Sequence, residues 1–196
     1  QPRIAGLTLA TARLLMSMCA KIAFISATFP EFLKKLIISK LGDIDEIKEI
    51  TPARDYTEGQ MTLEEYESDH EILRRKRHKI TVLSGTLETH IEKIIKKVNE
   101  GNKVLVIANH VKTAQNLYDL LIDYEPMLLH SRFNKRDRRD KEEMLISKYG
   151  VQPNLVIATQ VIEVSLDIDY DVMFTEPAPI DALIQRFGRV NRKGLR

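Results

Sequence analysis

Two arginines toward the C-terminal end of the sequence have a spacing suited to phosphate chemistry. Arg189 and Arg192 lie three residues apart in the segment QRFGRVNR, residues 185–192. On a helix they would share a face with Gln185, and two neighbouring guanidinium groups repel each other unless an anion lies between them. A triphosphate is the obvious candidate, because arginine offers phosphate oxygens a fork of donors, and Gly188 would allow close approach. The alternative is an exposed basic helix end, which the helix dipole favours near a C-terminus.

A polar loop is the second candidate. Residues 158–169, ATQVIEVSLDID, leave an apolar run and carry hydroxyl, amide and carboxylate groups, among them Thr159, Glu163 and Asp167. The alternative is a loop whose polar groups only satisfy one another.

A third segment, HSRF at residues 130–133, follows the short apolar run 127–129. It contributes Ser131 and Arg132, which could contact the backbone of a nucleic acid. The alternative is an ordinary N-terminal turn of the next helix.

The pattern of apolar residues predicts the elements that position these three segments. Short apolar runs predict strands, and stretches with helical spacing predict helices between them. Strands that are apolar on both faces and alternate with helices indicate an α/β fold with a parallel sheet covered on both sides, whose ligands bind at the carboxyl ends of the strands. We predict strands at 22–25, 80–83, 103–108, 127–129, 155–158 and 172–174, and helices at 7–20, 30–41, 87–98, 111–122, 135–149 and 179–190.

Composition excludes several classes of protein. The 196 residues include 30 Lys and Arg against 28 Asp and Glu, and 43% are hydrophobic, which is typical of a globular protein and not of a disordered or fibrous one. The lone Cys19 forms no internal disulfide, which favours a reducing compartment, and we expect a cytoplasmic protein. No apolar stretch is long enough to span a bilayer and no signal peptide is recognisable, so we expect no membrane partner.

Two of these segments resemble motifs of superfamily 2 helicases. The segment 185–192 resembles the sixth motif, which implies that Arg189 and Arg192 are arginine fingers and that Gln185 and Gly188 lie at the nucleotide. The loop at 158–169 resembles the fifth motif. By position, Thr159 would contact the nucleic-acid backbone, Asp167 the nucleotide ribose, and Glu163 would tie the two ligand sites together.

Two weaker matches have the order expected of that superfamily. Ser26 and Thr28, in the triplet SAT, resemble the third motif, whose hydroxyls couple the two motor lobes. Ser131 and Arg132 resemble the motif that holds the nucleic-acid backbone in the second lobe.

The combination of VIEVSLDID, EPAPID and QRFGRVNRKG is similar to the CRISPR-associated helicases of type I interference systems, over residues 22–194. The resemblance implies RecA-like lobes and an enzyme that couples ATP hydrolysis, with Mg²⁺, to translocation on single-stranded DNA in antiviral defence. It also implies two partners, an HD nuclease domain or subunit and a CRISPR surveillance complex.

Half of such a motor is missing from this sequence. None of the eight glycines begins a G-x-x-x-x-G-K phosphate loop, and the DEIK at residues 45–48 follows the SAT triplet instead of preceding it, so it is not a DExx box. The HD nuclease dipeptide is also absent, because Asp69 and His70 stand in the reverse order. No His or Cys residues have the spacing of metal ligands, so we expect no metal site in this chain and place the Mg²⁺ ligands in the missing lobe.

We therefore expect a fragment with three parts: the end of a first RecA-like lobe at 1–42, a connector at 43–78 and a second lobe at 79–196. Alone, it should be inactive. Two alternatives stay open: another superfamily 2 motor, such as an RNA helicase or a restriction translocase, and a non-catalytic α/β domain that binds nucleic acid.

Overall fold

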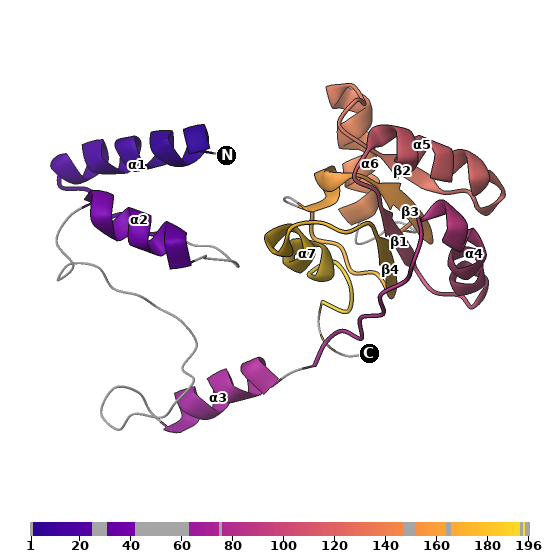
Figure 1. The fold of residues 1–196 in the computed structure, drawn as a ribbon, viewed down its shortest axis with the longest axis horizontal. Helices are drawn as coiled ribbons and strands as arrows, with labels where there is room; N and C mark the ends of the chain where they lie inside the picture. Colours follow the sequence, from indigo (N-terminus) through magenta and orange to yellow (C-terminus); the bar gives the residue numbers. More distant parts are fainter. Residues whose placement is uncertain are drawn as a thin grey trace. The chain divides into compact units, whose positions relative to one another are not determined.

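The chain forms two compact units, Gln1–Arg74 and Arg75–Arg196, which are described separately (Figure 1). A computed structural model describes residues 2–24, 31–41, 63–74, 76–146, 152–163, 166–192 and 194. Ser26 and Thr28, the predicted lobe-coupling residues, lie outside these ranges.

The first unit is helical in its described part. It contains α1 (Pro2–Ser17), α2 (Glu31–Leu41) and α3 (Leu63–Arg74), and α1 packs on α2. Residues 20–24 form no strand, so the strand predicted at 22–25 is wrong over its described part. Helix α3 lies within the predicted connector.

The second unit is built on a four-stranded sheet. Strands β1 (Val104–Ile107), β2 (Met127–Leu129), β3 (Leu155–Ala158) and β4 (Val172–Thr175) are all parallel and lie in the order β2-β3-β1-β4. Longer helices connect or flank them: α4 (Ile91–Asn99), α5 (Val111–Leu120), α6 (Lys135–Ile146) and α7 (Ile180–Phe187). Three short 3₁₀ helices complete the described elements: η2 (Glu88–His90), η3 (Ile122–Tyr124) and η4 (Gln160–Glu163).

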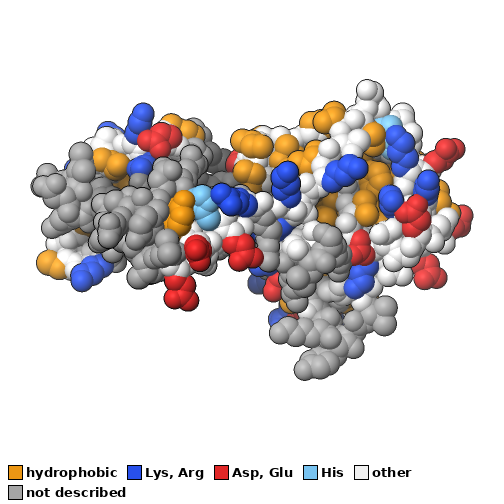
Figure 2. All heavy atoms as spheres, turned by 90° about the horizontal axis from the view of Figure 1, so that it is seen from below, with side chains coloured by type: hydrophobic (Ala, Val, Ile, Leu, Met, Phe, Trp, Pro, Cys, Tyr) orange, Lys and Arg blue, Asp and Glu red, His pale blue; other side chains and the backbone are white. Residues whose placement is uncertain are grey.

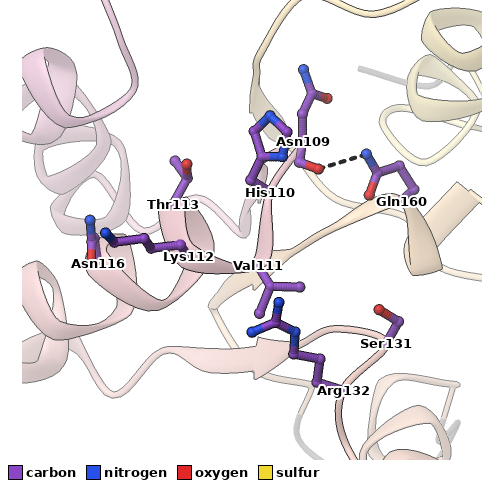
Figure 3. Close-up of a pocket in the computed structure, with 9 residues that line it drawn as sticks. All are labelled: Asn109, His110, Val111, Lys112, Thr113, Asn116, Ser131, Arg132 and Gln160. Carbon is purple, nitrogen blue, oxygen red and sulfur yellow. Dashed lines mark hydrogen bonds between the residues drawn. The ribbon is translucent and has the colours of Figure 1, made fainter.

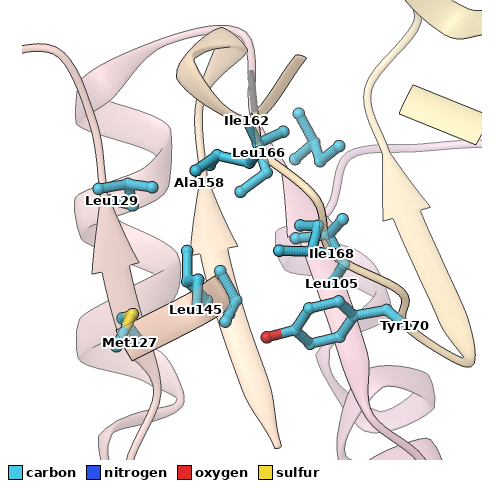
Figure 4. Close-up of a cluster of buried hydrophobic side chains, with 11 residues drawn as sticks. Leu105, Met127, Leu129, Leu145, Ala158, Ile162, Leu166, Ile168 and Tyr170 are labelled. Carbon is cyan, nitrogen blue, oxygen red and sulfur yellow. The ribbon is translucent and has the colours of Figure 1, made fainter. Parts of the chain in front are cut away.

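Each face of the sheet has its own apolar core. In β1, Leu105 and Ile107 point to one face and Val104 and Val106 to the other, and all four are fully buried. The first core includes a leucine of α6 and residues of the loop after β3 (Figure 4). The second core is completed by α4 and α5. The predicted parallel sheet with both faces covered is therefore confirmed.

A second predicted strand is absent from the structure, and the last predicted helix is too long. Residues 76–83 form no strand, and Val82 is 93% exposed, because no described strand lies beside this segment to pair with it. Helix α7 ends at Phe187, with Gly188 as its C-cap, whereas the predicted helix continued to Val190. None of the described helices is long and apolar enough to cross a membrane.

Candidate functional site

Several candidate residues follow the carboxyl ends of the strands, where parallel strands deliver their loops side by side. Asn109 is the second residue after β1. The residues directly after β2, β3 and β4 are His130, Thr159 and Glu176. On the face of the second unit seen in Figure 2, lysine and arginine side chains are scattered among apolar ones and form no single basic surface.

A buried arginine ties three of these strand ends together. Arg186 on α7 is 1% exposed, and its guanidinium donates to Glu163 Oε1 at 2.8 Å and to Thr175 Oγ1 at 2.7 Å. It also donates to the carbonyl of Glu176 at 3.1 Å and to Asn109 Oδ1 at 3.0 Å. A buried charge is tolerated only when it is paired and hydrogen-bonded in this way. Sequence analysis did not select Arg186, although it is adjacent to Gln185 in the motif.

Arg189 lies beyond the end of α7, in a turn that is held against the loop after β3. Its Nε donates to the carbonyl of Ile162 at 3.1 Å and its Nη2 to the carbonyl of Glu163 at 2.7 Å. Burial and the positive charge of Arg192 lower the pKa of Arg189, and Asp167 acts in the opposite direction. The guanidinium is thus partly desolvated and close to a second cation.

Arg192 forms an ion pair with Asp167, and its backbone N–H donates to Asp169 Oδ1 at 3.0 Å. Both partners of the ion pair reach solvent, since the side chain of Arg192 is 46% exposed and that of Asp167 is 84% exposed. The prediction that one helix face aligns the two arginines is wrong, because α7 ends before both. Instead, the turn at 188–192 folds back onto the loop that carries Glu163 and Asp167.

The two remaining nucleotide candidates lie at the end of α7. Gln185 is half-buried in the last turn, and Gly188 is exposed and donates its N–H to the carbonyl of Ile184 at 3.0 Å. A side chain at Gly188 would meet the carbonyl oxygen of Gln185 at 3.3 Å. Among the described residues, a side chain at Gly188 would therefore meet the last carbonyl groups of its own helix.

A pocket of about 670 Å³ opens at the ends of the first three strands (Figure 3). The first residues of α5 and the predicted DNA contacts Ser131 and Arg132 line it, and Gln160 closes one side by donating to the carbonyl of Asn109 at 2.8 Å. The complete lining is Asn109, His110, Val111, Lys112, Thr113, Asn116, Ser131, Arg132 and Gln160. The N-terminal N–H groups of α5 and the two cationic side chains of the lining make this pocket suited to phosphate.

Thr159 is placed differently from the other two predicted DNA contacts. It is 2% exposed, its N–H donates to the carbonyl of Leu129 at 3.1 Å, and it does not line the pocket. Its neighbour Gln160 lines the pocket instead. Sequence analysis did not select Gln160 or Asn109, and the only signal for them was a polar side chain within two residues of a strand end.

The ring of Phe133 is already covered by two side chains. His130 stacks on it with ring centroids 4.3 Å apart and 15° between the planes, and the Lys141 ammonium lies 4.9 Å from its centroid. His130 is 5% exposed, its Nδ1 has no partner among the described residues, and burial lowers its pKa. These contacts indicate a structural role for His130, because its ring is stacked and buried. No group of three His, Cys, Asp or Glu side chains in the described ranges could hold a metal ion.

Comparison with known proteins identifies the region that carries these groups. Residues 100–195 match the family described as CRISPR-associated nuclease/helicase Cas3, C-terminal. This region is therefore similar to the C-terminal part of the Cas3 nuclease/helicases.

The Cas3 relatives extend the similarity and show how much is missing. The CRISPR-associated endonuclease/helicase Cas3 of Escherichia coli is 39% identical over 116 residues, which are 53% of this chain and 13% of the relative. The Cas3 of Methanothermobacter thermautotrophicus is 27% identical over 197 residues, which cover 96% of this chain and 22% of the relative. The chain therefore spans less than a quarter of the length of either relative.

Two solved structures share sequence with part of this chain. The ATP complex of T. fusca Cas3 is 33% identical and covers 59% of this chain and 14% of that chain, with a TM-score of 0.47. A CRISPR RNA-guided surveillance complex in a pre-nicking state is also 33% identical and has the same TM-score. The resemblance to CRISPR-associated helicases predicted from three motifs is thus confirmed. The Cas3-matched residues include Arg189, Arg192, Asp167, Glu163 and the whole pocket lining.

Proposed function

We propose that this chain supplies the second motor lobe, residues 79–196, and the end of the first lobe, residues 1–42, of an ATP-dependent DNA helicase. In this proposal, the motor translocates on single-stranded DNA in the cytoplasm during CRISPR antiviral defence. The observation that carries the proposal is the position of Arg189 and Arg192, which a turn holds against the loop that carries Glu163 and Asp167. Arginine side chains offer phosphate oxygens a planar fork of donors, and an exposed carboxylate can accept a hydrogen bond from a ribose hydroxyl.

On the nucleotide side, Arg189 and Arg192 act as arginine fingers, Asp167 contacts the ribose, and Gln185 and Gly188 lie at the nucleotide. Asp167 is paired with Arg192 in the present structure, so nucleotide binding must exchange this ion pair for new contacts. The exchange costs little, because an exposed ion pair contributes only about 0–1 kcal/mol. Mg²⁺ is held by carboxylates of the first lobe, together with the phosphates.

On the DNA side, Ser131, Arg132 and the α5 N-terminus hold backbone phosphates in the pocket at the strand ends. Phosphate contacts carry no base information, so binding is independent of sequence. We include Thr159 in this interface as part of the loop after β3. Because Thr159 is buried, its neighbour Gln160 makes the contact with DNA in the pocket. Glu163 connects the two sides through its ion pair with Arg186, which also holds Asn109 of the pocket.

The partners follow from the Cas3 relatives. The E. coli relative is named an endonuclease/helicase, and one matched structure is a CRISPR RNA-guided surveillance complex. We propose an HD nuclease, on the same or a separate chain, and a surveillance complex as the partners of the complete protein.

The experiment that tests this function is a comparison of nucleic acids as activators. ATP hydrolysis by the complete protein, with Mg²⁺, is measured with single-stranded DNA and with RNA of the same sequence. DNA should stimulate hydrolysis and RNA should not. Stimulation by RNA alone would assign a different motor of the superfamily, and no hydrolysis with either would leave a binding domain.

A further inference from the structure

The arginine turn, residues 188–192, is held by a segment far away in the sequence. His78 Nε2 donates to the carbonyl of Val190 at 2.7 Å, and Asn191 Nδ2 donates to the carbonyl of Arg77 at 2.8 Å. A longer contact joins Arg77 Nη1 to the carbonyl of Arg192 at 3.4 Å. The ring of His78 also lies 5.9 Å from the ring of Phe187, the last residue of α7. More than 110 residues separate the two segments.

A second set of hydrogen bonds joins the turn to Tyr170, which lies two residues before β4. Tyr170 donates its N–H to the carbonyl of Arg189 at 2.9 Å and accepts the N–H of Asn191 at 3.1 Å. Asn191 has a φ of 43°, a left-handed conformation that asparagine tolerates better than most residues. The turn therefore has no helix to define it, and it is held by Tyr170 on one side and by Arg77 and His78 on the other.

The contacts of Arg77 and His78 do not come from burial of an apolar core. Residues 76–86 are exposed throughout and have no regular structure. The described hydrogen bonds to the arginine turn are therefore the main contacts that give this segment a defined position at residues 77–78. Because the segment adds no residue to either apolar core, its hydrogen bonds to the arginine turn are the structural role that we infer for it.

We propose that Arg77 and His78 are positioning residues for the arginine turn, and that they hold Arg189 and Arg192 in the orientation used on the nucleotide. The inference rests on the proposed function, because it assigns those arginines to ATP hydrolysis. Residues 77–78 end the proposed connector between the lobes, so the arginine turn is attached to the end of that connector.

The test compares two histidines that make the same kind of bond. His78→Ala removes the bond to Val190, and His90→Ala removes a bond of 2.8 Å from His90 Nε2 to the carbonyl of Ser84, elsewhere in the same lobe. In the complete protein, His78→Ala should lower kcat for DNA-stimulated ATP hydrolysis by roughly three- to tenfold, the equivalent of one hydrogen bond. KM for ATP and the affinity for DNA should change less than about twofold, because uniform binding is not affected. His78→Gln, which places a donor near the same position, should recover most of the loss, and His90→Ala should leave kcat unchanged.

Two further measurements separate positioning from a general loss of stability. Combined with Arg189→Ala, His78→Ala should cause a smaller loss than it causes alone, because part of its effect acts through Arg189 and the rest through Arg192. Amide hydrogen exchange at residues 188–192 should be faster in His78→Ala and unchanged in His90→Ala. If the unmodified protein does not hydrolyse ATP, that result overturns the proposed function only. The exchange measurement still tests whether His78 holds the arginine turn. Unchanged kcat and exchange in His78→Ala, or a full additional loss in the Arg189→Ala background, would overturn the inference.

Discussion

Arg186 Nε and Glu163 Oε1 lie 2.8 Å apart, and the arginine side chain is 1% exposed while that of glutamate is 13% exposed. The same guanidinium donates to Asn109, which lines the pocket at the strand ends, and the backbone of Glu163 accepts a hydrogen bond from Arg189. One buried ion pair therefore lies between the proposed DNA contacts and the proposed arginine fingers.

Loss of this ion pair should destabilise the lobe strongly. Arg186→Leu should lower the free energy of unfolding by about 3–5 kcal/mol, because it leaves Glu163 unpaired in a nearly buried position. Arg186→Lys should recover only part, since an ammonium cannot serve acceptors from three strand ends at once. Unfolding in urea gives both values.

The control is Arg139→Ala, which breaks the ion pair with Glu143 that is also 2.8 Å long but exposed on α6. It should cost no more than about 0.5 kcal/mol. Equal costs for Arg186→Leu and Arg139→Ala would contradict the structural role of the buried pair.

Buried His130 should make stability depend on pH. Burial lowers its pKa in the folded state, so the unfolded chain binds a proton more readily as the pH falls below about 6.5. The free energy of unfolding is therefore highest above that pH, and it decreases as the pH falls toward the lower pKa of His130 in the folded state. His130→Phe keeps the stacked ring, removes the unpartnered Nδ1 and should flatten this part of the pH profile without lowering stability at pH 8. A pH profile of the melting temperature that is the same in both proteins would exclude this role.

The strands of the sheet were predictable because each is a short apolar run, and β1 and β3 are fully buried on both faces. The segment Ile80–Leu83 has similar residues and is exposed, since pairing depends on a neighbouring strand that local sequence does not encode. Gly188 was a stop signal for α7, and extending the helix to Val190 overlooked it.

The missed Arg186 had a signal of a different kind. It lies three residues after the apolar Leu183, so the two side chains share one side of a helix, and a charge on an apolar side requires a buried partner. The partner, Glu163, lies 23 residues away in sequence, and only the fold brings the two together.

The isolated chain of 196 residues should release no phosphate from ATP at any DNA concentration. Its sequence contains neither a phosphate loop nor a DExx carboxylate for Mg²⁺. The complete protein in the same assay is the positive control. DNA-stimulated phosphate release by the purified chain would show that this assignment of the catalytic parts is wrong.

Removal of the Arg132 charge should weaken DNA binding without changing base preference. Arg132→Ala should lower the slope of log affinity against log salt by roughly 0.7 for single-stranded DNA, the value for one phosphate contact. The loss should be similar for all sequences, because Arg132 faces a pocket suited to backbone phosphate. Arg139→Ala, which removes an arginine outside the pocket, should leave the slope unchanged. An altered base preference with an unchanged slope in Arg132→Ala would refute the phosphate contact.

The central claim is that Arg189 and Arg192 act on ATP, and it is tested most directly in the complete protein by measuring ATP turnover at saturating DNA alongside DNA affinity. Arg189→Ala and Arg192→Ala should each lower turnover by about 10²-fold or more, toward the low side for arginine fingers because one arginine remains. DNA affinity should change little, and substitution by lysine should rescue poorly because an ammonium lacks the planar fork. A collapse of DNA affinity with turnover preserved at saturation would contradict the account and assign this turn to a basic DNA-binding surface.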